Sequence, residues 1–170
     1  LGGDLLAEQA RRLLADLVND LPGVLLVKEE TEFSSVLMTE TMRLVGDRQV
    51  GFMGGKAGKA LLDEHRRGAC GTMPACEVAD VHVALWNALE ARDEARAKEI
   101  FRRLLPLLSF EVGYGPAIYK EVLRRRGVIG TGFFRQTGGR VLDDLAHAEL
   151  TAILDDLTAF MHDGYRPRSA

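Results

Sequence analysis

The stretch Leu21-Pro22-Gly23-Val24-Leu25-Leu26-Val27-Lys28-Glu29-Glu30 decides the fold of this chain. A Pro-Gly pair opens it, a run of apolar residues rich in branched side chains follows as far as Val27, and charged residues close it. A short apolar run between turn signals predicts a strand that is buried on both faces, as strands of parallel sheets are. Lys28 follows directly, and a lysine at the end of such a strand is unusual because lysines are rarely buried.

Helical patterns lie on both sides of this strand. Before it, apolar residues recur at helical spacing between Asp4, an expected N-cap, and Pro22. After it, Ser34 or Ser35 is expected to cap a helix that ends at Gly46. The same patterns predict strands at 49–53 and 69–73, a helix between them at 56–67, and then helices only, at 78–91, 94–108, 117–126 and 142–162.

Strands that alternate with helices predict right-handed crossovers and a parallel sheet, and therefore an α/β fold. Three strands are few for such a sheet, because parallel sheets need cover on both faces and a three-stranded sheet leaves two open edges. The sequence also begins at Leu1 rather than at a methionine. We therefore expect an incomplete sheet whose remaining strands lie upstream in a longer chain.

Composition excludes several functional classes. The chain has 170 residues, of which 46% are hydrophobic and 28% charged, so it is long and apolar enough to bury a core. A net charge of -3 gives no drive toward nucleic acid or an anionic membrane, and no apolar run approaches the ~20 residues of a membrane span. Cys70 and Cys76 are too few for a disulfide framework, so a reducing, cytoplasmic compartment is the simplest expectation.

Ligands of α/β folds bind at the carboxyl ends of the strands, where Lys28, the Gly54-Gly55 pair and Met73 are expected. Burial disfavours the charged form of an amine, and a neutral amine can attack a carbonyl carbon. Lys28 is therefore a candidate nucleophile. The commoner alternative is a structural lysine that reaches water or pairs with Glu29 or Glu30.

The Gly54-Gly55 pair has two interpretations of about equal weight. Backbone amides at a helix N-terminus can approach a carboxylate or phosphate where glycines leave room. Alternatively, the pair only makes a tight turn from strand to helix. The segment is not a phosphate loop, because that pattern needs a glycine at Met53 and a serine or threonine at Ala60.

Five segments, in order, resemble the dihydrodipicolinate synthase and N-acetylneuraminate lyase family. The stretch at 21–30 resembles the segment that carries the family's Schiff-base lysine, and Val50-Gly51-Phe52-Met53-Gly54-Gly55 resembles the strand whose final glycine contacts the keto acid. Gly68-Ala69-Cys70-Gly71-Thr72-Met73-Pro74 resembles the last barrel strand. The stretches at 95–107 and 116–123 resemble helices that follow the barrel.

The resemblance implies a partial (β/α)8 barrel, in which these strands are the sixth to eighth, followed by a C-terminal helical extension. It divides the chain into a barrel part, 1–92, and an extension, 93–170. A whole barrel takes ~250 residues, so the family's catalytic tyrosine and its carboxylate-binding hydroxyl residues would lie upstream. Departures from the family pattern at Arg135-Gln136-Thr137 and Thr72-Met73-Pro74, together with Lys28-Glu29-Glu30, lean slightly toward a sugar-acid branch.

The implied activity is that of a class I lyase acting on pyruvate or 2-keto-3-deoxy sugar acids by aldol cleavage, condensation or dehydration. Lys28 would form the Schiff base, and Gly54, Gly55 and the backbone at Met73 would hold the keto acid. No metal or dissociable cofactor is implied, and the family's usual assembly implies a homodimer or homotetramer. Because several site groups would lie upstream, we expect this chain alone to be inactive.

Two other functional classes stay open. The chain is alternatively a non-catalytic interaction module, whose three βα units only support the C-terminal helices, or an α/β domain whose glycine pair holds a phosphate. An adduct that borohydride traps on Lys28 would favour the lyase. Protection by a phosphate ligand without an adduct would favour phosphate binding.

Overall fold

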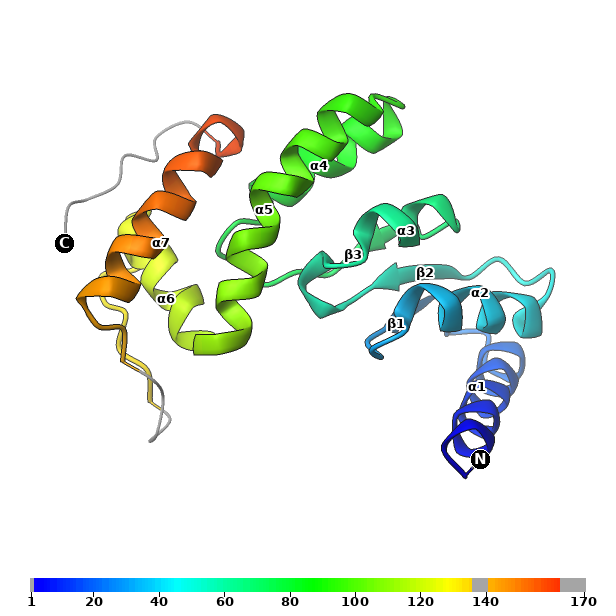
Figure 1. Cartoon of the computed structure of the whole chain (residues 1–170). Helices are drawn as coiled ribbons and strands as arrows, with labels where there is room; N and C mark the ends of the chain where they lie inside the picture. The colour runs from blue at the N-terminus through cyan, green and yellow to red at the C-terminus, as the bar shows by residue number, and fades with distance from the viewer. Residues whose placement is uncertain (1, 136–140, 163–170) are drawn as a thin grey trace. The chain divides into compact units, whose positions relative to one another are not determined.

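A computed structural model describes residues 2–135 and 141–162, and the chain divides into two compact units, Leu1–Pro74 and Ala75–Ala170 (Figure 1). Gln136 and Thr137, where the sequence departs from the family pattern, lie outside the described residues. None of the described helices combines the length and the hydropathy that crossing a membrane requires.

The first unit contains the predicted parallel sheet, in the order β1-β2-β3. Its strands are β1 (Leu26–Glu29), β2 (Gly51–Gly54) and β3 (Gly71–Thr72). Its helices are α1 (Gly2–Asp20), α2 (Ser34–Val45) and α3 (Leu61–Arg66), with a 3-10 turn, η1 (Lys56–Gly58), before α3. Strand and helix therefore alternate as the sequence pattern predicts.

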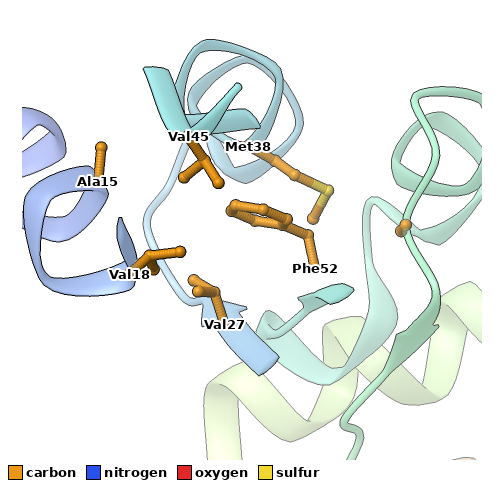
Figure 2. Close-up of a cluster of buried hydrophobic side chains, with 7 residues drawn as sticks. Ala15, Val18, Val27, Met38, Val45 and Phe52 are labelled. Carbon is orange, nitrogen blue, oxygen red and sulfur yellow. The ribbon is translucent and has the colours of Figure 1, made fainter. Parts of the chain in front are cut away.

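One face of the sheet carries the core of this unit. Val27 and Phe52 are register partners on β1 and β2, so their side chains lie on the same face. Figure 2 shows side chains from α1 and α2 converging on them. The buried cluster consists of Ala15, Val18, Val27, Met38, Val45, Phe52 and Ala69.

The other face of β1 is open, so the expectation of a strand buried on both faces is wrong. Exposure alternates along β1, and the side chain of Leu26 is 60% exposed while Val27 is buried. The physical reason is that the described helices that pack on the sheet cover only the Val27 face. The strand also begins at Leu26 rather than at Gly23, which places Lys28 inside it.

Three expected helix starts are also wrong. The first helix begins at Gly2, so Asp4 is not its N-cap. The residue before α2 is Phe33, and no side chain caps that helix; Ser34 instead donates its hydroxyl hydrogen to a buried carboxylate. The helix expected from Lys56 begins only at Leu61, because Lys56 and Ala57 have left-handed backbones, with φ of 49° and 57°.

The second unit is helical, as predicted. Its helices are α4 (Ala79–Glu90), α5 (Glu94–Tyr114), α6 (Pro116–Arg125) and α7 (Asp144–Leu157), with a 3-10 turn, η2 (Thr158–Phe160), at the end. Helix α5 packs against α4, α6 and α7. It is longer than expected and continues through Pro106, whereas α7 is shorter than expected. The side chains of Asp93 and Asp143 cap α5 and α7.

The two units do not coincide with the expected division at residue 92. Helix α4 would belong to a barrel by its place after a strand, but it packs on α5 and lies in the second unit. The expected boundary separates barrel from extension, whereas the observed boundary separates two groups of residues that pack together. The observed boundary therefore does not test the expected one, and the division at residue 92 stays a prediction.

The one-sided core predicts that Phe52→Ala lowers the free energy of unfolding by about 3–5 kcal/mol, the usual cost of emptying a buried phenylalanine site. Phe33→Ala is the matched control, because its ring is 76% exposed against 3% for Phe52. Urea unfolding of both variants, followed by circular dichroism, measures the difference. Equal losses of stability would contradict the proposed position of the core.

Candidate functional site

Lys28 lies on the open face of the sheet, close to the carboxyl end of β1. Its register partner is Met53, and the next pair along is Glu29 with Gly54, the last residue of β2. The Nζ atom of Lys28 lies 2.6 Å from Oε2 of Glu30, and both side chains are partly exposed. Lys28 therefore pairs with Glu30, which is one of the alternatives that the sequence left open.

The carboxylate of Glu30 also holds the turn after β2. Its second oxygen, Oε1, accepts a hydrogen bond of 2.8 Å from the backbone amide of Lys56. A Cβ atom at Gly55 would overlap this carboxylate and lie 2.8 Å from the carbonyl oxygen of Glu29. The hydrogen bonds from Lys28 and from the Lys56 amide lower the pKa of Glu30. Gly55 is therefore the residue that lets the acid approach the turn.

The same turn carries a second lysine–glutamate pair. Nζ of Lys56 lies 2.7 Å from Oε1 of Glu32, and this hydrogen bond raises the pKa of Lys56. The left-handed backbones of Lys56 and Ala57 are unusual for residues with a Cβ atom, and such conformations persist where neighbouring contacts hold them. Glu30 on the amide and Glu32 on the ammonium are two such contacts.

Gly54 serves a different purpose from Gly55, because its α-carbon faces the helices. A Cβ atom there would overlap the carboxylate of Glu64, a fully buried residue of α3. Ser34 donates a 2.6 Å hydrogen bond to Oε1 of Glu64. Burial raises the pKa of Glu64, and the bond from Ser34 offsets only part of that effect. Close packing against this acid is thus a structural reason for glycine at position 54.

Met73 lies at the same end of the sheet. Its amide donates a 2.9 Å hydrogen bond to the carbonyl oxygen of Gly54, and Thr72 is the register partner of Gly54. The side chain of Met73 is 47% exposed. The structure thus brings Lys28, Gly54, Gly55 and Met73 to one end of three parallel strands. Their roles toward a keto acid stay predictions.

Sequence reasoning named Glu30 only as one of two alternative ion-pair partners of Lys28, and it gave Glu64 no role. The signal for Glu30 was present, because residues two apart on a strand share a face, and Lys28 and Glu30 are two apart. No comparable signal marks Glu64, since its partner Ser34 is thirty positions away. Among the described residues, no group of three or more His, Cys, Asp or Glu is placed to hold a metal ion.

Comparison with solved structures gives clear matches. The chain is similar to the dihydrodipicolinate synthase of Rhodopseudomonas palustris, with 26% identity and a TM-score of 0.77 over 86% of this chain and 50% of that one. It is similar to the synthase of Oceanobacillus iheyensis, with 21% identity and a TM-score of 0.73 over the same shares. It also matches a monomeric dihydrodipicolinate synthase variant, with 17% identity and a TM-score of 0.74 over 89% of this chain and 50% of that one. No family model and no curated protein matches the chain.

The parallel sheet, its helices and these matches define the class of protein: an α/β fold that corresponds to part of a (β/α)8 barrel followed by helices. Within that class the chain is similar to one part of dihydrodipicolinate synthases, and it spans about half the length of the solved structures it matches. The fold class and the resemblance to dihydrodipicolinate synthases expected from the sequence are confirmed.

The packing of Gly54 on Glu64 predicts that Gly54→Ala destabilises the first unit by about 1–3 kcal/mol, the usual cost of overpacking. Gly23→Ala is the matched control, because a Cβ atom at Gly23 has no neighbour within 4 Å. Urea unfolding of the two variants measures both effects. If the Gly54 variant were as stable as the Gly23 variant, the close contact with Glu64 would be absent in solution.

Proposed function

We propose that this chain carries the Schiff-base half of a class I lyase that acts on pyruvate or a 2-keto-3-deoxy sugar acid. The observation that carries the proposal is the position of Lys28, on the open face and at the carboxyl end of β1, in a chain similar to dihydrodipicolinate synthases. Parallel α/β folds bind their ligands at that end of the strands.

In the proposed reaction, the amine of Lys28 condenses with the ketone of the keto acid to give an iminium ion. The iminium withdraws electrons from the neighbouring carbon, so a carbon–carbon bond can break or form, or water can leave, through an enamine. Gly55 and the backbone at Met73, which lie at the same end of the sheet, are proposed to contact the keto acid. The backbone at Gly54 is proposed to do the same, although its α-carbon faces Glu64.

The charges around the turn favour a keto acid on Lys28 over the alternative of a phosphate on the glycine pair. The amide of Lys56 already donates to Glu30, and Glu32 lies on the ammonium of the same lysine. Both carboxylates beside the turn are paired with lysines, so the turn offers neither a free amide at Lys56 nor a net positive charge to a doubly charged anion. No described contact favours the third class, a non-catalytic helical module.

Assembly, compartment and substrate remain proposals. The open edges of the sheet are a reason for association into a homodimer or homotetramer. One of the matched structures is a monomeric variant, so this fold is found without such assembly. The cytoplasmic location rests on the small number of cysteines, and the keto-acid substrate rests on the family resemblance.

Incubation with pyruvate and borohydride is expected to leave one reduced adduct on the peptide that contains Lys28, because borohydride traps an iminium ion. Lys28→Arg should abolish the adduct while keeping a positive charge beside Glu30. Lys56→Arg is the matched control, since Lys56 makes a similar pair with Glu32, and it should still be trapped. Mass spectrometry of the peptides measures the result. The absence of an adduct, or its presence on Lys56 instead, would overturn the proposed function.

Residues 1–170 alone are expected to show no aldol turnover, even where the adduct forms. General acid–base groups are typically worth ~10²- to 10⁴-fold in rate, and the family's tyrosine has no counterpart assigned in this chain. A chimera that joins the chain to the complementary half of the Rhodopseudomonas palustris synthase should gain turnover, measured by pyruvate release from a keto-deoxy acid. Equal turnover by the chain and the chimera would show that the other half is dispensable.

A further inference from the structure

We propose that Glu30 is an additional acid–base residue of Schiff-base formation, which takes protons that leave Nζ of Lys28 and delivers them to the departing oxygen of the keto acid. The inference rests on the proposed function, because it needs an iminium ion on Lys28. Both residues belong to this chain: Lys28 lies on β1, and Glu30 follows the last residue of that strand.

The geometry gives Glu30 direct access to the reacting nitrogen. Oε2 lies 2.6 Å from Nζ of Lys28, which is within the range for proton transfer along a hydrogen bond. Oε1 is held by the amide of Lys56, so the carboxylate is fixed at one oxygen and presents the other to the amine. The absence of a Cβ atom at Gly55 makes room for this arrangement.

Neighbouring acids are engaged elsewhere. Glu29 is buried on the opposite face, and its Oε1 accepts a hydrogen bond from the amide of Thr31. Glu32 pairs with Lys56, and Glu64 is buried beneath Gly54 with Ser34 on its carboxylate. All of these residues are glutamates, but Glu30 is the one whose carboxylate lies within hydrogen-bond distance of Nζ of Lys28.

Schiff-base formation needs such a group because two protons must move. The ammonium of Lys28 and a ketone give an iminium ion that keeps one N–H, together with one molecule of water. A new bond joins Nζ to the carbonyl carbon, and the carbon–oxygen bond breaks. Nζ loses two protons and the oxygen gains both before it leaves. Glu30 takes each proton from Nζ and passes it to the oxygen, so the carboxylate is regenerated and no further reactant is consumed.

A purely electrostatic role for Glu30 would have the opposite effect on rate. A carboxylate that only stabilises the ammonium of Lys28 holds the amine in its unreactive form, so its removal would speed attack on a ketone at neutral pH. A carboxylate that transfers protons speeds the same reaction, so its removal slows it. The sign of the change separates the two roles.

The test measures the initial rate of pyruvate-dependent borohydride trapping at pH 7 in the whole chain. Glu30→Gln keeps an oxygen that can accept the hydrogen bond from Lys56 but cannot carry the proton, and it should slow trapping by about 10²-fold. Glu94→Gln is the matched control, because it removes the acid of an exposed lysine pair in the second unit, and it should trap at the parental rate. A Glu30→Gln variant that traps as fast as the parent, or faster, would overturn the proposal.

Chemical rescue separates proton transfer from a loss of structure. In Glu30→Ala, added acetate supplies a carboxylate from solution, so it should raise the trapping rate of this variant and leave that of the parent unchanged. If acetate had no effect while the parent still formed its adduct, Glu30 would only position the turn, and the proposal would fail by itself. If the parent formed no adduct, the proposed function would fail, and the role of Glu30 with it.

Discussion

The period-two alternation of β1 is the constraint on which the first unit depends. Val27 and Phe52 face α1 and α2 and form the core, so Leu26 and Lys28 must face the other way. A shift of one residue would bury the ammonium of Lys28 among apolar side chains and expose Val27, at a cost of several kcal/mol. The core therefore determines the face on which the candidate nucleophile lies.

The turn after β2 is held by two acids that follow β1. Glu30 bridges the ammonium of Lys28 and the amide of Lys56, and Glu32 binds the side chain of Lys56. These contacts hold a left-handed backbone at Lys56 that a residue with a Cβ atom adopts only where its surroundings support it. Lys28, Glu30 and the turn at Lys56 thus form one connected group. Within it, Lys28 and Glu30 are the residues proposed to take part in the reaction.

The two glycines at the end of β2 show how the two faces of one strand are used. Gly54 makes room for the buried carboxyl of Glu64 on the helix side, where burial raises the pKa of that acid. Gly55 makes room for Glu30 on the side of Lys28, where two hydrogen bonds lower the pKa of that acid. The pKa values of these two glutamates are therefore shifted in opposite directions. Desolvation raises the pKa of Glu64, whereas hydrogen bonds and nearby positive charge lower the pKa of Glu30.

Local sequence determined the order of the elements, the parallel sheet, the position of Lys28 near the end of a strand and the likeness to dihydrodipicolinate synthases. These features depend on hydrophobic periodicity, turn residues and motif order, all of which lie within a few residues of one another. The tertiary structure alone decided that β1 is open on one face and that Ser34 binds Glu64 instead of capping α2. Each of these depends on contacts between segments or on the face toward which a side chain points, and a single sequence does not record which helices cover which face.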